Sequence, residues 1–496
     1  MADTSRDAAY VRQGMIGQRT PPVADRGAIR WLRENLFSSP LNAILTILGA
    51  LAVWYMLSGL VPWLLRSVWD ADSLAECRAI VQQRYGEGVT GACWAMVRAR
   101  WHQYIFGFYP PALYWRPVLA FALMFFAIAP LLFADNRRAR LILLSAVTVL
   151  GGGALFGVVY GVAPRLLGAP VESGWLPWAL SAALIGLLGL AAFRPRAFLG
   201  FVALYPVIAY WLLWGGSVWG PVCVLLGFVL LALVYRLLSP HLGAAAGAGA
   251  AVVAAVVWWL ALQGYVSGPL QAALPAALES VNSDRFGGFL LSITIGVTAI
   301  AGSLPLSILL ALGRQSDMLI VKTLSVGFIE FIRGVPLITL LFTASLLLQY
   351  FLPPRTNFDI ILRVIILVTL FAAAYLAEVI RGGLAALPRG QYEAADSLGL
   401  DYWRAQRLII MPQALKISIP GIVSTFIGLF KDTTLVSLVG LLDPLRGVTS
   451  VVRADIAWKG IYWEPYILVG TLFFVICFGM SRYSMALERR LQTDHR

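Results

Sequence analysis

The chain has 496 residues, of which 59% are hydrophobic and 13% are charged. A soluble domain is roughly 45–50% apolar and about 25% charged, and a soluble protein of this size could not keep so much apolar side chain away from water. Most of the net charge of +13 comes from arginines, and they lie in short gaps between apolar runs. They do not form one basic face with stacking aromatics, which argues against nucleic-acid binding. The composition therefore indicates an integral membrane protein.

Apolar runs divide the chain into an N-terminal and a C-terminal group of spans. A bilayer core needs about 20 apolar residues per helix, and by this measure the sequence predicts an all-α polytopic fold with about twelve transmembrane helices. The polar segment 1–40 is too long before the first apolar run to be a secretory signal peptide. The N-terminal region 41–264 has predicted spans near 41–64, 118–133, 141–162, 176–193, 198–214, 221–238 and 246–264. The C-terminal region 289–485 has them near 289–312, 322–350, 361–380, 417–441 and 466–483.

The basic residues predict the orientation of these spans. If segment 1–40 is cytoplasmic, alternating spans place nearly all arginine-rich gaps on the same side, as the positive-inside rule requires. The tail 486–496, with Arg489 and Arg490, then also lies in the cytoplasm. The loop 66–117 carries several arginines outside, which is tolerated because long loops translocate with less regard to charge. Loop 66–117 and the connector 265–288 are therefore expected in the periplasm of a bacterial inner membrane, with both termini cytoplasmic.

Loop 66–117 contains Cys77 and Cys93, whereas Cys223 and Cys477 lie within predicted spans. Thiols outside the inner membrane are oxidised, so a disulfide between Cys77 and Cys93 is one expectation. Two free cysteines on a short helical hairpin are the other, since spacing does not establish disulfide geometry.

The sequence motifs of several kinds of enzyme are missing. A phosphate-binding loop needs a Gly-Lys pair, and none of the four lysines follows a glycine. There is no HExxH motif, no GxSxG motif and only three histidines. We therefore expect no catalytic residues, no metal site and no cofactor on this chain.

The segment 381–412 is a cytoplasmic loop with an unusual pattern. Strong helix formers around Glu393, Ala394 and Ala395 predict a short helix, and Gly399 suits its C-terminal cap. A second helix is expected from residue 402 to residue 411, with Pro412 breaking it before the next span. A helix, a sharp glycine turn and a second helix that project from the membrane indicate a docking element.

This loop resembles the EAA loop of type-1 ABC transporter permeases. The hallmark is EAA, three residues, Gly, nine residues and Ile-x-Leu-Pro. Here Glu393, Ala394, Ala395, Gly399, Ile409 and Pro412 fill the hallmark positions, with Met411 where leucine is usual. The segments FIEFIRGVPLI and FKDTTLVSLVG narrow the resemblance to the polar amino-acid subfamily. The extra N-terminal spans look like those of the long permease subunit of a general L-amino-acid transporter.

The resemblance implies a complex of several chains. The region 289–485 would be the five-helix core of the family, and this chain would import L-amino acids together with a second permease subunit. Two ATPase subunits, which hold ATP and Mg, would bind the cytoplasmic loops, and a periplasmic amino-acid-binding protein would deliver the substrate. The helix ending at Gly399 would then carry motion from the ATPase to the permease, and the lipid bilayer would surround the spans.

Charged residues inside spans are costly and are therefore candidates for function. Glu330 and Arg333 are three residues apart, as are Glu378 and Arg381, so each pair shares a helix face. Structural ion pairs near the cytoplasmic end are the plain interpretation. Pro336 is expected to bend or break its helix.

The most polar run in any span is Lys431-Asp432-Thr433-Thr434. Lys431 and Asp432 point about 100° apart on a helix, so they do not simply pair with each other. An amino acid offers one ammonium and one carboxylate, which this run could recognise along the substrate pathway. The alternative for Thr433 and Thr434 is interhelical hydrogen bonding.

Two other functions compete with an ABC permease. A stand-alone secondary amino-acid transporter would favour inverted repeats and broken helices at matching places in its two halves. The N-terminal spans contain no counterpart of the C-terminal motifs, so no such repeat is seen. A membrane-bound enzyme is disfavoured by the missing catalytic motifs. An ABC permease needs a separate ATPase to be active, whereas a secondary transporter does not.

Overall fold

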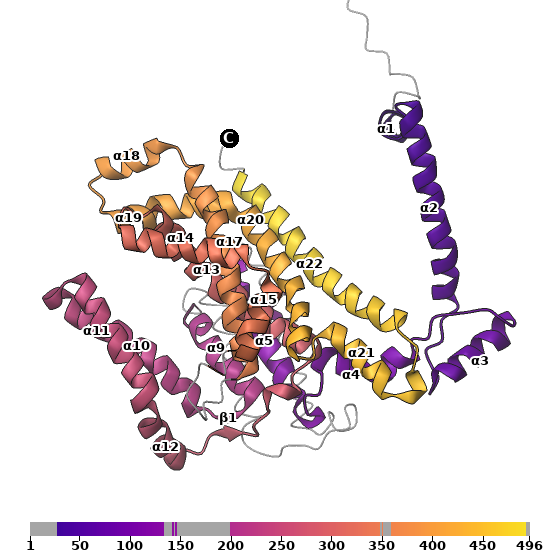
Figure 1. The fold of residues 1–496 in the computed structure, drawn as a ribbon, viewed down its shortest axis with the longest axis horizontal. Helices are drawn as coiled ribbons and strands as arrows, with labels where there is room; N and C mark the ends of the chain where they lie inside the picture. The colour runs from indigo at the N-terminus through magenta and orange to yellow at the C-terminus, as the bar shows by residue number, and fades with distance from the viewer. Residues whose placement is uncertain are drawn as a thin grey trace, which may run out of the picture. The chain divides into compact units, whose positions relative to one another are not determined.

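The computed structural model describes residues 27–132, 141–142, 144–145, 199–347, 350 and 359–492. The described chain is almost entirely helical, as predicted, and it divides into two compact units, Met1–Met96 and Val97–Arg496. Figure 1 shows the helices of both units as ribbons. The predicted spans near 141–162 and 176–193 lie almost wholly outside the described residues.

The first unit holds one long apolar helix and a small loop module. Helix α1 (Gly27–Asn35) precedes α2 (Pro40–Leu65), in which no residue is buried within the chain. A helix that is apolar on every side suits a lipid environment. Helix α3 (Leu74–Tyr85) follows, and the Ser73 hydroxyl caps it by accepting from the Glu76 amide at 3.2 Å.

The N-terminal part of the second unit contains two short strands. Strand β1 (Gly216–Ser217) pairs antiparallel with β2 (Ala277–Leu278). Polar contacts hold distant segments of this part together. The Tyr109 hydroxyl donates to the Leu213 carbonyl at 2.8 Å, and the Trp214 indole donates to the Ser283 hydroxyl at 2.8 Å. Its helices are α4 (Ala95–Phe106), η2 (Pro111–Leu113), α5 (Trp115–Leu132), α9 (Leu199–Trp214), α10 (Trp219–Leu242), α11 (Ala244–Val257), η3 (Trp258–Leu262), α12 (Gln263–Ala273) and η4 (Ser283–Arg285).

The C-terminal part of the second unit is a bundle in which α13 packs along α17, α17 along α20, and α20 along α22. Small residues allow these close approaches, as is usual between membrane helices. A side chain at Gly383 would meet the Ala414 carbonyl oxygen of α20 at 2.5 Å. The helices are α13 (Gly288–Gln315), α14 (Leu319–Gly334), α15 (Leu337–Phe342), η5 (Thr343–Leu347), α17 (Ile360–Ala385), α18 (Arg389–Ser397), α19 (Tyr402–Ala405), η6 (Gln406–Ile410), α20 (Met411–Asp432), η7 (Thr433–Val439), α21 (Pro444–Ala454), η8 (Ile456–Trp458) and α22 (Trp463–Gln492).

A backbone seam joins α4 to the start of the core. Gly107 has φ +66°, and a side chain there would come within 2.3 Å of the Gly287 Cα atom. The Gly288 amide donates to the Leu442 carbonyl at 2.8 Å. Glycines at this seam let three segments that are far apart in sequence pack backbone to backbone.

Within the described residues, eight helices are long and apolar enough to cross a membrane. The expected span near 322–350 is not one helix, because α14 ends at Gly334 and α15 begins after Pro336. A proline removes one helical hydrogen bond and its ring clashes with the preceding turn, so this break was predicted. The expected span near 198–214 is the shorter apolar helix α9. The prediction of about twelve spans is thus only roughly met.

Candidate functional site

The loop between α17 and α20 contains the predicted helix, glycine turn and second helix. Helix α18 ends in a Schellman motif, in which the Gly399 amide donates to the Asp396 carbonyl at 2.9 Å and the Leu400 amide to the Ala395 carbonyl at 3.2 Å. Gly399 has φ +67°, a left-handed conformation that glycine adopts without strain. Asp401 then caps α19 by accepting from the Arg404 amide at 2.9 Å. The turn is therefore a defined structure and not a loose linker.

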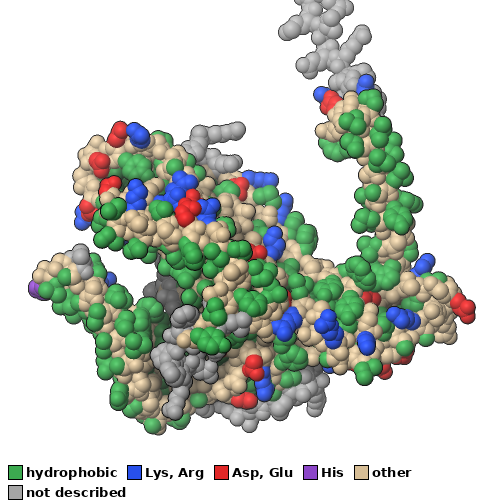
Figure 2. Space-filling model, viewed as in Figure 1, with side chains coloured by type: hydrophobic (Ala, Val, Ile, Leu, Met, Phe, Trp, Pro, Cys, Tyr) green, Lys and Arg blue, Asp and Glu red, His purple; other side chains and the backbone are tan. Residues whose placement is uncertain are grey.

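An apolar surface is exposed on this loop. Glu393 and Ala394 face outward, whereas the Ala395 side chain is buried against the bundle. Figure 2 shows charged side chains of both signs gathered over α14, α18 and α19. Four large apolar side chains of this segment are exposed as well. They are Leu398, Tyr402, Trp403 and Leu408.

Helix α18 is fastened to the bundle on its other side. The Gln413 side-chain amide donates to the Gln391 side-chain oxygen at 2.9 Å, which joins α20 to α18. Tyr392 packs partly buried against the apolar cluster beneath, and this burial raises the pKa of its hydroxyl. Helix α18 is therefore attached both to α20 and to the apolar cluster beneath it.

The prediction that Pro412 ends a helix was wrong. Helix α19 continues through the π-helical turn η6 into α20, with Pro412 in the first turn of α20. Hydrogen bonds in a π turn run to the fifth residue, and such turns insert into α-helices without ending them. The wider turn accommodates the proline ring and its missing amide.

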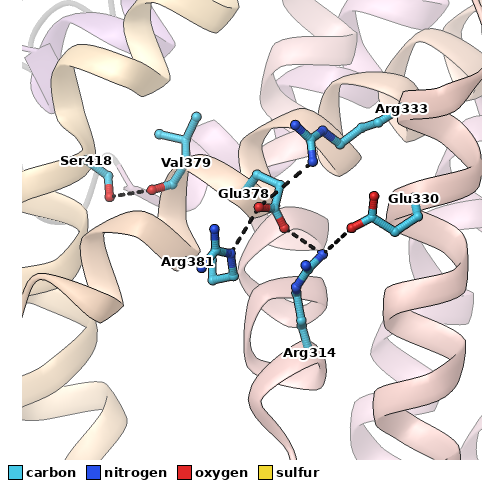
Figure 3. A network of polar contacts seen from close by, with 7 residues as sticks. All are labelled: Arg314, Glu330, Arg333, Glu378, Val379, Arg381 and Ser418. Atoms are coloured by element: carbon cyan, nitrogen blue, oxygen red, sulfur yellow. Dashed lines mark hydrogen bonds and ion pairs between the residues drawn. The ribbon is translucent and has the colours of Figure 1, made fainter.

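A network of charged side chains lies where α13, α14 and α17 meet (Figure 3). Glu378 of α17 is at its centre, with its side chain 15% exposed. Its Oε1 atom lies 2.7 Å from Nη1 of Arg314, and its Oε2 atom accepts a hydrogen bond from Nε of Arg381 at 3.0 Å. Arg333 of α14 approaches Oε2 at 3.9 Å. One carboxylate thus interacts with guanidinium groups from three helices.

One of the two predicted ion pairs is different in the structure. Glu378 and Arg381 pair as expected, but within the described residues Glu330 pairs with Arg314 at 2.8 Å and not with Arg333. Glu330 and Arg333 share a helix face and could reach each other. Arg314, in the last turn of α13, lies closer to Glu330 and pairs with it instead. The pairing of Glu330 with Arg314 was not predicted, because the neighbours of Arg314 depend on how the helices pack.

The polar run near residue 432 ends a helix. Lys431 is exposed and Asp432 is partly exposed in the last turn of α20, and within the described residues neither side chain forms an ion pair or a hydrogen bond. The hydroxyls of Thr433 and Thr434 donate to the Phe430 and Lys431 carbonyls at 2.7 and 2.9 Å, within their own helix. Thr433 is fully buried. Of the four residues, Lys431 and Asp432 are therefore the ones free to meet a ligand.

Cys77 and Cys93 form a disulfide, with Cα atoms 5.9 Å apart. Beside it, Trp69 and Trp94 stack with ring centroids 5.6 Å apart. Both contacts lie within the first unit and close the loop module on itself. Among the described residues, no group of three or more His, Cys, Asp or Glu side chains is arranged to hold a metal ion.

Comparison with known proteins gives relatives along the whole chain. The chain is 58% identical to the glutamate/glutamine/aspartate/asparagine transport system permease protein BztC of Rhodobacter capsulatus, over 99% of this chain and 100% of that protein. It is 34% identical to the inner membrane amino-acid ABC transporter permease protein YhdY of Escherichia coli, over 94% of each chain.

Other relatives match the C-terminal part alone. The glutamate/aspartate import permease protein GltK of Escherichia coli is 30% identical over 41% of this chain and 91% of its own length. Residues 303–493 match the family described as "Binding-protein-dependent transport system inner membrane component". The chain therefore belongs to the type-1 ABC permeases of the polar amino-acid subfamily, and it is the membrane-spanning permease of a binding-protein-dependent importer.

Proposed function

We propose that this permease moves acidic amino acids and their amides across the bacterial inner membrane, with both of its termini in the cytoplasm. The observation that carries the proposal is the 58% identity to a glutamate/glutamine/aspartate/asparagine permease along essentially the whole of both chains. ATP and Mg would be bound by two separate ATPase subunits. A second permease subunit and a periplasmic amino-acid-binding protein would complete the importer.

The cytoplasmic loop supports the coupling part of this proposal. Glu393, Ala394 and Gly399 lie on a short helix and turn that project outward, beside the exposed apolar side chains of α19 and η6. The buried Ala395 and the π turn before Pro412 fasten that helix to α20. An element exposed to a partner on one side and fixed to the bundle on the other is suited to passing motion between them.

The end of α20 supports the substrate part. An amino acid carries an ammonium and a carboxylate, and the acidic substrates carry a second carboxylate. Lys431 and Asp432 present one charge of each sign without partners in the described chain. Charge-assisted hydrogen bonds are about twice as strong as neutral ones, so such a pair would orient the substrate. Thr433 and Thr434 would contribute by ending α20 at this point.

Uptake of labelled glutamate by cells that produce the complete importer tests the proposal. We expect uptake to stop when ATP is depleted and to persist when the proton gradient alone is collapsed. Unlabelled glutamine, aspartate and asparagine should compete, while lysine should not. Uptake that follows the proton gradient and ignores ATP would instead support a stand-alone secondary transporter.

A further inference from the structure

Arg314 lies between two carboxylates that belong to different helices. Its Nη1 atom is 2.8 Å from Oε1 of Glu330 on α14 and 2.7 Å from Oε1 of Glu378 on α17. Figure 3 shows its side chain rising from α13 into the space between them. A single guanidinium nitrogen therefore joins three helices.

The two contacts are not equivalent. The contact with Glu330 has the geometry of a hydrogen bond, and that carboxylate is 55% exposed. The contact with Glu378 is close enough for an ion pair but lacks hydrogen-bond geometry, and within the described chain Oε1 of Glu378 accepts no hydrogen bond. A buried carboxylate oxygen without a donor is unfavourable. A modest rotation of the guanidinium would satisfy Glu378 at the expense of Glu330, whose exposed oxygen can bond to water instead.

The position of this contact connects it to the coupling loop. Helix α17 ends at Ala385, and α18 begins at Arg389, so Glu378 lies two helical turns before that end. Helix shifts of about 1–2 Å are common in switching transitions. A shift of that size between α14 and α17 would exchange one favourable Arg314 contact for the other.

We propose that Arg314 is a positioning residue of the transport cycle, which hydrogen-bonds Glu330 in one state of the permease and Glu378 in the other. Each state then keeps one full charge-assisted hydrogen bond across the helix interface, so neither state is strongly preferred until the ATPase moves α18. This inference rests on the proposed ATP-driven function, and it adds a residue outside the coupling loop that sets the balance between the two states.

The alternative is that these ion pairs are the same in both states and only stabilise the packing of the helices. Neutralising either carboxylate would then weaken that packing, and both variants would change activity in the same direction. An exchanging contact behaves differently, because removing one acceptor favours the state that uses the other. Opposite effects of the two neutralisations are the distinguishing result.

The test uses the complete importer reconstituted in liposomes with wild-type, Glu330→Gln or Glu378→Gln permease. ATP hydrolysis is measured without the binding protein, and ATP consumed per glutamate transported is measured with it. We expect the two variants to change binding-protein-independent hydrolysis by at least about three-fold in opposite directions, at unchanged KM for glutamate. Asp284→Asn neutralises an exposed carboxylate of η4, outside the network, and should behave as wild type.

The outcomes separate the two proposals. A wild-type importer that transports glutamate without ATP overturns the proposed function. A wild-type importer that is ATP-driven, with both variants shifted in the same direction or neither shifted, overturns the role of Arg314 alone. If Glu378→Gln does not accumulate, Glu378→Asp replaces it, because its shorter side chain keeps the charge but withdraws it from Arg314.

Discussion

Gly399 shows how one residue can be required for its backbone alone. Its φ of +67° closes the Schellman turn after α18, yet a side chain added there would meet no atom within 4 Å. The constraint is therefore conformational and not steric. A left-handed residue other than glycine costs roughly 1–2 kcal/mol, and a β-branched one costs more.

We therefore expect Gly399→Val to lower glutamate uptake by roughly ten-fold, because the strained turn would displace α18 from its partner. Gly390→Val is the matched control, since Gly390 lies at the start of α18 without a positive φ and with open space around it. Uptake is compared at equal amounts of permease in the membrane, measured by immunoblotting. Equal uptake by the two variants would show that the turn geometry does not matter for coupling.

Lys431 and Asp432 allow a second test at the same scale. Hydrogen bonds to charged groups are worth about 1.5–3 kcal/mol, so Lys431→Met and Asp432→Asn should each raise KM for glutamate by roughly ten-fold or more. Lys459→Met removes an exposed lysine outside the spans and should leave KM unchanged. Unchanged uptake kinetics in both Lys431→Met and Asp432→Asn would remove these residues from the substrate pathway.

At the scale of elements, the core depends on close contacts between α17 and α20. Neighbouring glycines of α17 have opposite surroundings. A side chain at Gly383 would meet the Ser418 hydroxyl and the Ala414 carbonyl oxygen, whereas one at Gly382 would meet no atom within 4 Å. The sequence shows two glycines in a row and does not reveal which one faces the partner helix.

The same substitution at these two positions should have opposite effects. Gly382→Ala should leave thermal stability unchanged or raise it by up to about 1 kcal/mol, because alanine is the better helix former. Gly383→Ala should lower it by about 1–3 kcal/mol, because the added methyl group overpacks the interface with α20. Thermal unfolding of the purified permease in detergent measures both. A loss of stability at Gly382 equal to that at Gly383 would contradict this packing.

At the scale of the whole molecule, the arrangement of charges predicts the sidedness of the permease. The distribution of basic residues predicts that segment 381–412, the tail and segment 1–40 share one side of the membrane, and that the connector 265–288 lies on the other. Packing inside the chain does not fix orientation, because the bilayer acts on the charges that flank the spans.

Cysteine labelling in intact cells tests this topology. A cysteine added at either terminus should resist a membrane-impermeant maleimide until the inner membrane is opened. Asp284→Cys, at an exposed position of the periplasmic connector, should react without that step and serves as the positive control. Labelling of either terminus in cells whose inner membrane is intact would reverse the assigned orientation of that terminus.

The sequence by itself determined the membrane class, the helical fold and the helix, glycine turn and helix of the loop between α17 and α20. Apolar length, charge placement and the glycine turn are local properties that hold regardless of how the helices meet. Local pattern was misleading at Pro412, where a π turn carries the helix through a residue that usually ends one. The break at Pro336 was correctly expected, but the length of the span around it was not.

Only the tertiary structure decided which charges and glycines meet. Spacing along one helix suggested that Glu330 would pair with Arg333, but Arg314 reaches it from another helix. The same packing gives Glu378 two further arginine neighbours, Arg314 and Arg333, and places Gly383 against Ala414. Such contacts depend on the crossing and relative height of helices, which are set by side chains distant in sequence. A linear pattern specifies the face of a helix but not the neighbour that this face meets.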